Sequence, residues 1–196
     1  MHVTTARFLG VSLAPWPFFA FASPLQRGSD EKSITKEQQE QIRDNYLALW
    51  GGDYTLSDKV LSSGVTLNID RHPTANGSAP VIVNNSKEFM DFLKWSRTGW
   101  EKFAFKVVHW AADGHNIAIR WKLEAVMGED YSAPTRAAAD DHHCARGSTL
   151  KPGDHVTYNG TDFLVLNKCT GLVDEVNIAQ DIMNLFHALG MTSVPV

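Results

Sequence analysis

Residues 103–125 read FAFKVVHWAADGHNIAIRWKLEA, and this stretch decides the fold. Apolar side chains recur at every second position on both sides of Asp113-Gly114, a dipeptide typical of the tight turn of a β-hairpin. This period places the apolar residues of each strand on one face of a sheet. We therefore predict two antiparallel strands with one apolar face, made of Phe103, Phe105, Val107, His109 and Ala111 from the first strand and Ile117, Ile119, Trp121, Leu123 and Ala125 from the second.

The sequence on either side of this hairpin supplies further helices and strands. Thr35 and Gln38 form a capping-box pattern at the start of an amphipathic helix that ends at Gly51-Gly52. The remaining predicted elements are a helical turn at 56–61, strands at 65–69, 155–167 and 172–179, a helix from Ser86 to Gly99 and a last helix at 182–189. Helices followed by hairpin-linked strands predict the α+β class, with one antiparallel sheet in a single domain at 35–190.

The composition is that of an ordinary globular protein. The chain has 196 residues, 10% of them aromatic, and a formal net charge of −4. Its 6 Trp and 10 Phe supply enough apolar surface for a sizeable core, which excludes a disordered chain and a small disulfide-held scaffold. The slight acidic excess argues against a broad basic surface for nucleic acid.

The N-terminal residues have the pattern of a cleaved secretory signal. Arg7 precedes an uncharged, mostly apolar run that ends in Ala-Phe-Ala before Ser23. A buried or membrane-spanning helix is the alternative, but Pro15 and Pro17 would interrupt it and the run is short for a span. We therefore expect a secreted protein, with a signal at 1–22, a polar leader at 23–34 and a tail at 191–196.

Secretion makes covalent modification relevant. A disulfide between Cys144 and Cys169 is the less favoured alternative, because the intervening segment would have to run back along the predicted strand almost fully extended. Asn76, Asn84 and Asn159 each begin an acceptor sequence for N-glycosylation if the host is a eukaryote.

Asp162 is the most informative single residue. It shares a strand face with Val156, Tyr158, Leu164 and Leu166, so a carboxylate stands where a strand normally carries core side chains. Burial disfavours the charged form and would raise the pKa of this carboxyl group toward the range of a general acid or base. A structural carboxylate, at the rim of the sheet or held by a neutral partner, is the alternative.

Three further residues are candidates for the same site. His109 lies in the apolar register of the first hairpin strand, where a lone histidine is more often a core residue than a functional one. Paired across the sheet with Asp162, it would be a second catalytic group. Tyr46 and Trp50 on the first helix would either line a pocket or belong to the core, and the core is the simpler interpretation of both.

No motif points to a metal or a cofactor. Asp140-Asp-His-His-Cys144 gathers potential metal ligands, but consecutive loop residues rarely converge on one ion, so we predict a solvent-exposed segment. The sequence has no phosphate-binding glycine loop, dinucleotide-binding fingerprint, serine-hydrolase elbow or zinc-protease helix. We therefore expect neither cofactor nor metal.

A long polar loop at 128–153 joins two predicted strands. Loops of this length in compact domains often serve as lids over a site. We predict that Met127, Tyr131 and Ala137–Ala139 cover a pocket while 140–143 face solvent. A surface insertion without contact to the pocket is the alternative.

The C-terminal motifs carry a family resemblance. Val156-Thr-Tyr-Asn-Gly-Thr-Asp162 is followed by Gly171-Leu-Val-Asp-Glu-Val-Asn177, and then by Asp181 and a closing Leu-Gly at 189–190. This order resembles the end of the SnoaL-like polyketide cyclases, Val-x-Trp-x-Gly-x-Asp, then Gly-Lys-Ile-x-Glu-x-Trp, an Asp and Leu-Gly. The helix at Ser86, the Asp113-Gly114 turn and the segment 118–121 are also similar, so the likeness covers about 36–190.

The resemblance implies a nuclear-transport-factor-two-like or ketosteroid-isomerase-like cone, in which a curved antiparallel sheet encloses an apolar pocket. It also implies cofactor-free closure of polyketide rings, with the Asp at position 162 as the general acid/base. We therefore predict acid/base catalysis on an apolar polyketide-like or terpenoid-like substrate, with His109 or Tyr46 stabilising or protonating the developing oxyanion. The residues expected to bind substrate are Trp50, Phe105, Trp121 and Asn177, the last in place of a family Trp.

Other functions stay open at this point. A secreted, non-catalytic small-molecule binder is favoured by Asn177 and by the absence of a family histidine from 122–127. Dehydration and epoxide hydrolysis are run by relatives of the fold, but the epoxide-hydrolase pattern needs a pocket arginine, and Arg120 lies in the polar register. We also expect a homodimer through the outer sheet face, no nucleic-acid partner and no stable membrane span.

Overall fold

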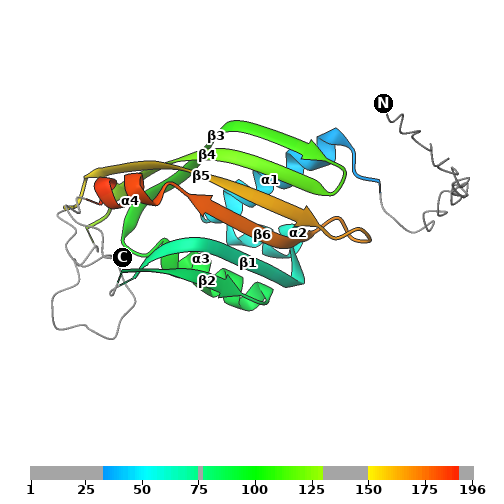
Figure 1. Ribbon diagram of the computed structural model, residues 1–196, viewed down its shortest axis with the longest axis horizontal. Helices are drawn as coiled ribbons and strands as arrows, with labels where there is room; N and C mark the ends of the chain where they lie inside the picture. The colour runs from blue at the N-terminus through cyan, green and yellow to red at the C-terminus, as the bar shows by residue number, and fades with distance from the viewer. Residues whose placement is uncertain (1–32, 75–76, 130–149, 190–196) are drawn as a thin grey trace, which may run out of the picture.

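The computed structural model describes residues 33–74, 77–129 and 150–189 (Figure 1). Its helices are α1 (Lys36–Trp50), the short 3-10 helix η1 (Tyr54–Leu56), α2 (Ser57–Val60), α3 (Ser86–Ser96) and α4 (Ile182–Ala188). Its strands are β1 (Leu61–Thr74), β2 (Gly77–Val83), β3 (Trp100–Asp113), β4 (Asn116–Met127), β5 (His155–Leu166) and β6 (Val173–Gln180). The predicted signal, most of the leader, most of the long loop and the tail lie outside the described residues.

The strands form one six-stranded sheet in the order β2-β1-β6-β5-β4-β3. The α+β class is therefore confirmed. An entirely antiparallel sheet is wrong, because β1 and β6 pair in parallel in the middle of the sheet. These two strands come from opposite ends of the domain, so no hairpin constrains their relative direction. Strand β2 is an addition to the predicted elements; it lies at the edge of the sheet and contains Pro80, a residue that edge strands tolerate.

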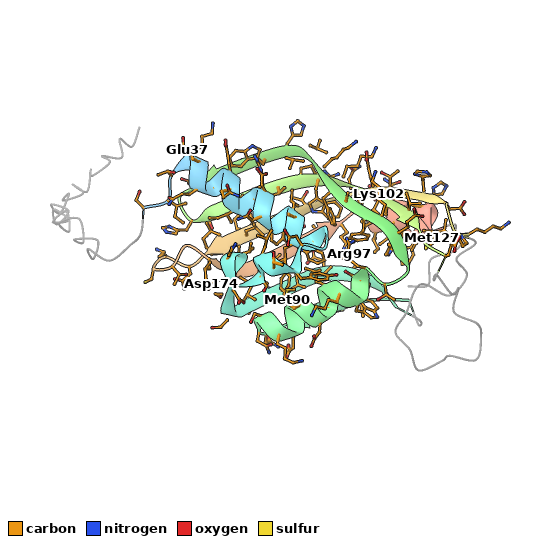
Figure 2. All side chains as sticks on the ribbon, turned by 180° about the vertical axis from the view of Figure 1, so that it is seen from behind. Glu37, Met90, Arg97, Lys102, Met127 and Asp174 are labelled. Atoms are coloured by element: carbon orange, nitrogen blue, oxygen red, sulfur yellow. The ribbon has the colours of Figure 1, made fainter. Side chains whose placement is uncertain are left out.

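Helices α1 and α3 lie on one side of the sheet (Figure 2). The predicted capping box begins α1, since Gln38 N donates to Thr35 Oγ1 at 3.3 Å and Thr35 N donates to Gln38 Oε1 at 2.9 Å. The last turns of α1 bury Tyr46, Leu49 and Trp50 against the inner face of the sheet. This packing encloses an apolar interior between the helices and the sheet.

A bulge in β3 changes which residues face that interior. Val107 pairs with Trp121 and His109 with Arg120, so Val108 is one residue extra on β3. Before the bulge Phe103 is buried, whereas beyond it Trp110 packs against the core and His109 is exposed. The prediction that His109 belongs to the apolar face is therefore wrong, because an added residue exchanges the two faces of a strand.

The described residues on either side of the long loop meet at the end of β4 that carries Met127, which Figure 2 labels. Met127 N donates to Asp154 O at 2.9 Å and Gly153 N donates to Met127 O at 2.8 Å, so the base of the loop is closed. Across the described ranges, no helix is long and apolar enough to cross a membrane.

Candidate active site

Asp162 lies in the middle of β5, between Ile119 of β4 and Ile178 of β6. The alternation that buries Val156, Leu164 and Leu166 also buries this carboxyl group, which is only 3% exposed. A charged group at such a position requires hydrogen-bonding partners or a shifted pKa. Asp162 has both.

Two donors from different elements hold the Asp162 carboxyl group. Tyr46 Oη on α1 donates to Oδ2 at 2.8 Å, and Trp121 Nε1 on β4 donates to Oδ1 at 2.7 Å. A carboxylate oxygen accepts more than one hydrogen bond, so each oxygen keeps capacity for a ligand proton. The carboxyl group is therefore fixed in orientation and remains able to act as a base.

Burial raises the pKa of Asp162 from 3.8 to about 7, and the hydrogen bonds from Trp121 and Tyr46 oppose this rise. The pKa of Tyr46 lies well above its usual range, chiefly because of burial and then because of the negative charge of Asp162, with a smaller opposing effect of the Trp50 indole. Asp162 thus exchanges its proton near neutral pH, where a general acid or base is most effective.

The carboxyl group faces a cavity of about 120 Å³. One water needs roughly 10–15 Å³ on this measure, so the cavity has room for a small organic molecule. Asp162 is the only acidic residue among the described residues that line it, and none of them is Lys or Arg. Most of the wall is aromatic or aliphatic: Trp50, Ile69, His72, Phe92, Trp95, Trp100, Phe103, Phe105, Trp121, Leu123, Tyr158, Ile178, Leu185 and Leu189, with Ser96, Thr98 and Gln180 as the other polar members.

Gly160 lets Trp121 reach Asp162. A Cβ added at Gly160 would lie 2.1 Å from Trp121 Cζ2, closer than real Cβ contacts, so only glycine leaves room for the indole. The indole also packs edge-on against Phe105, with ring centroids 5.0 Å apart, and against Tyr158 at 5.6 Å. The Gly-x-Asp spacing in β5 therefore has a packing reason, because Gly160 makes space for the donor that holds Asp162.

The structure brings most of the predicted site residues together. Trp50, Phe105, Trp121 and Asp162 line the cavity. Tyr46 is fully buried and reaches the cavity only through Asp162, which makes it a positioning residue rather than a wall residue.

Asn177 and His109 are corrections to the predicted pocket. Asn177 lies on the outer face of β6, where its Oδ1 accepts from Asn68 Nδ2 at 3.1 Å and its Nδ2 donates to Glu175 Oε1 at 2.8 Å. The inward positions next to it are Ile178 and Gln180, which line the cavity. His109 lies on the outer side of β3 because of the bulge.

Sequence reasoning missed two polar wall residues. The predicted strand at 65–69 stops before His72, yet β1 continues past this residue, and the His72 ring packs against Trp95 at 5.4 Å and Phe92 at 5.6 Å. Gln180 lies one residue beyond the predicted end of its strand. The inward-outward alternation of β6, continued from Ile178 by two residues, would have identified Gln180. For His72 such an extrapolation from Ile69 fails, because the register of β1 shifts between these two residues.

Several predictions fall on other parts of the chain. Tyr131, Ala137–Ala139 and the run 140–144 lie outside the described residues, as does Asn76. Met127 is described and is a fully buried residue of β4 away from the cavity wall, so its part in the proposed lid is wrong. Asn84 and Cys169 are exposed, and Asn159 is half-buried in β5. Within the described ranges, no three potential metal ligands lie close enough together to hold an ion.

Solved structures share this fold, although no family model and no curated protein sequence matches the chain. A protein from Jannaschia sp. CCS1 described as a SnoaL-like polyketide cyclase is 14% identical, with 85% of this chain and 98% of that chain covered and a TM-score of 0.56. A protein with a ketosteroid isomerase-like fold from Catenulispora acidiphila is 9% identical over 77% and 93% of the two chains, with a TM-score of 0.54. An LEH-like epoxide hydrolase from M. tuberculosis is 11% identical over 77% and 88%, with a TM-score of 0.50. The chain therefore has the ketosteroid-isomerase-like fold expected from the resemblance.

Proposed function

We propose that the protein is a cofactor-independent acid/base enzyme that acts on a small apolar carbonyl compound, as a cyclase or isomerase of polyketide-like or terpenoid-like molecules. The observation that carries this proposal is the buried Asp162 carboxyl group, which two donors orient toward an aromatic cavity and whose pKa is about 7. Proteins of this fold include ones described as polyketide cyclases, which supports the choice of substrate class.

The proposed reaction begins with proton transfer. The Asp162 carboxylate takes a proton from the carbon next to the substrate carbonyl, and the electron pair of that C–H bond moves into an enolate. In an isomerisation the protonated Asp162 returns the proton to another carbon of the conjugated system. In a cyclisation the enolate carbon attacks a second carbonyl of the same molecule, and Asp162 protonates the resulting alkoxide. Either sequence regenerates the carboxylate without a cofactor.

Epoxide hydrolysis with an Asp-Arg-Asp set has less support. Arg120 is half-buried on the outer face of β4, where its Nη1 donates to Thr161 Oγ1 at 3.2 Å. Asp162 is also the only carboxylate among the described wall residues. The pocket therefore offers a single acid/base group rather than a paired set.

Secretion, N-glycosylation and a homodimer remain parts of this proposal. The apolar side chains of Val108 in the β3 bulge and Phe163 on β5 are 46% and 42% exposed, which supports a partner on the outer side of the sheet.

Proton exchange in a model ketone tests the proposed chemistry directly. 1-Tetralone, a bicyclic ketone, exchanges the hydrogens next to its carbonyl for deuterium in D₂O, and mass spectrometry follows the rate. We expect the protein to accelerate this exchange and Asp162→Asn to lose about a hundred- to ten-thousand-fold of the acceleration. Glu124→Gln, the same change on the outer face, is the matched control and should exchange at the wild-type rate.

Two outcomes would reject the catalytic assignment. Equal acceleration by the wild type and a folded Asp162→Asn protein would remove Asp162 as the base. A ketone that binds in the cavity without any accelerated exchange would instead favour the non-catalytic binder.

A further inference from the structure

The cavity wall carries two polar atoms that the fold leaves without partners. Trp50 Nε1 and Gln180 Oε1 are both shielded from water, and neither forms a hydrogen bond of normal geometry with a described residue, although the Trp50 indole lies close enough to the Tyr46 hydroxyl group to lower the pKa of that group. Both side chains line the cavity, and Trp50 is only 7% exposed. Shielded polar groups in native proteins are almost always paired, so each of these atoms calls for a partner.

The two atoms have opposite hydrogen-bonding character. An indole Nε1–H is a donor only, whereas an amide oxygen is an acceptor. They stand on different elements, Trp50 at the end of α1 and Gln180 at the end of β6, with Asp162 of β5 also on the wall. A ligand that pairs with both must therefore carry one acceptor and one donor at separate positions.

The wall around Trp50 has little freedom to rearrange. The Trp50 ring contacts Tyr46, Phe89, Phe92 and Phe105 edge-on, with centroids 6.3, 5.7, 6.4 and 6.3 Å away. A side chain packed on four sides cannot easily turn its ring. The indole lies close enough to the Tyr46 hydroxyl group to lower the pKa of that group, but its N–H forms no hydrogen bond of normal geometry there, so an acceptor on a ligand in the cavity would pair with this donor.

The proposed reaction needs a donor for the developing oxyanion. Tyr46 uses its hydroxyl proton on Asp162 and is not part of the wall, and His109 is on the other side of the sheet. Preorganised donors aimed at a developing negative charge are among the largest contributions to catalysis. Trp50 is a buried donor on the wall whose N–H forms no hydrogen bond of normal geometry with a described residue.

We propose that Trp50 and Gln180 recognise the two ends of a hydroxy-ketone, with the Trp50 indole N–H donating to the carbonyl oxygen and the Gln180 amide oxygen accepting from a separate hydroxyl group. The aromatic wall adds a preference for a flat, bicyclic or larger skeleton. This inference rests on the proposed function for the role of the carbonyl group, and it names the substrate class of the same site.

Equilibrium binding of three related ketones tests this recognition. The probes are 6-hydroxy-1-tetralone, 6-methoxy-1-tetralone, which lacks the donor, and 1-tetralone, which lacks the substituent, with dissociation constants measured by calorimetry. We expect the wild type to bind the hydroxy-ketone about tenfold more tightly than the other two, the size of one net hydrogen bond. Gln180→Leu should bind all three alike.

Trp50→Phe separates the second contact from the first. This change keeps an aromatic side chain and removes the N–H, so all three ketones should bind about tenfold more weakly while the preference for the hydroxyl group remains. Asn68→Leu, which removes a half-buried amide from the outer face, is the control and should alter neither affinity nor preference.

Three binding results would contradict recognition of a hydroxy-ketone by Trp50 and Gln180. A hydroxyl preference that persists in Gln180→Leu, an unchanged ketone affinity in Trp50→Phe, or no binding of any probe would each reject it. These measurements need no turnover, and they can be repeated in Asp162→Asn. If the ketones bind with the predicted preferences but the wild type does not accelerate proton exchange, only the proposed catalysis is rejected. If the wild type accelerates exchange but the ketones bind without these preferences, only the proposed recognition by Trp50 and Gln180 is rejected.

Discussion

The pKa of a carboxyl group shifts in opposite directions on the two faces of the sheet. Glu124 on the outer face of β4 forms an ion pair with Lys106, with Nζ and Oε1 2.7 Å apart, and the Lys106 hydrogen bond lowers the pKa of this partly exposed carboxyl group. Asp162 on the inner face of β5 has no cation beside it among the described wall residues, and burial raises its pKa to about 7. The face of the strand, rather than the residue type, therefore decides whether a carboxylate is inert or reactive near neutral pH.

The largest expected effect is a pH dependence of stability that comes from Asp162. Its pKa is about 7 in the folded protein and near 3.8 in the unfolded chain, so the folded protein holds the extra proton between these values. The contribution of Asp162 to the free energy of unfolding is therefore greatest below about pH 4, falls as pH rises toward 7, and is constant above that. The difference between the two pKa values corresponds to on the order of 4 kcal/mol.

Comparison with Asp162→Asn isolates this contribution. The amide does not titrate, so the free energy of unfolding of the wild type should fall relative to that of the variant as pH rises from 4 to 7. Urea denaturation at a series of pH values measures the difference. Glu124→Gln should show no such relative gain with rising pH, and a flat difference for Asp162→Asn would mean that the carboxyl group is solvated in the folded protein.

A smaller effect is expected where the inner face is most tightly packed. Gly160→Ala places a methyl group 2.1 Å from the Trp121 indole, so the ring must move and its hydrogen bond to Asp162 must weaken. Overpacking of this kind costs about 1–3 kcal/mol. We expect thermal unfolding to shift downward and ketone exchange to fall, because the carboxyl group loses one of its two donors.

Gly64→Ala is the matched control for this change. A Cβ at Gly64 of β1 meets no atom within 4 Å, so the substitution should leave the unfolding temperature and the exchange rate close to wild type. If the two variants behaved alike, the close approach of β5 to Trp121 would not be what positions the indole.

The sequence predicts the elements of this fold better than the side-chain directions. Alternation in 117–125 and the capping box at Thr35 mark elements whose local signals agree with the final structure. The direction of His109 depends on one extra residue in β3, and no local signal marks that residue. The parallel pairing of β1 with β6 is equally invisible, because it joins segments more than a hundred residues apart.

In the candidate site too, residues with a local sequence signal could be predicted, whereas side-chain directions that depend on register could not. Asp162 could be found because an acidic residue in an apolar register is a local anomaly, and Trp121 because it falls in a regular strand. Asn177 was chosen from the family pattern, but the inward polar residue at this end of β6 is Gln180. Aligning a motif position with a family residue does not fix the direction of the side chain when the residue type has changed.

The smallest expected effect concerns the hydroxyl group behind Asp162. Tyr46→Phe removes a hydrogen bond that stabilises the charged carboxylate, so the pKa of Asp162 should rise further above about 7. Because the base is active when deprotonated, the midpoint of the pH–rate profile of ketone exchange should move upward by about half to one pH unit. Tyr158→Phe is the inner-face control, since Tyr158 lines the cavity but its hydroxyl group has no part in holding Asp162. The Tyr158 variant should keep the wild-type midpoint. An equal shift in both variants would show that the pKa of Asp162 responds to the loss of any nearby hydroxyl group and not specifically to the hydrogen bond from Tyr46.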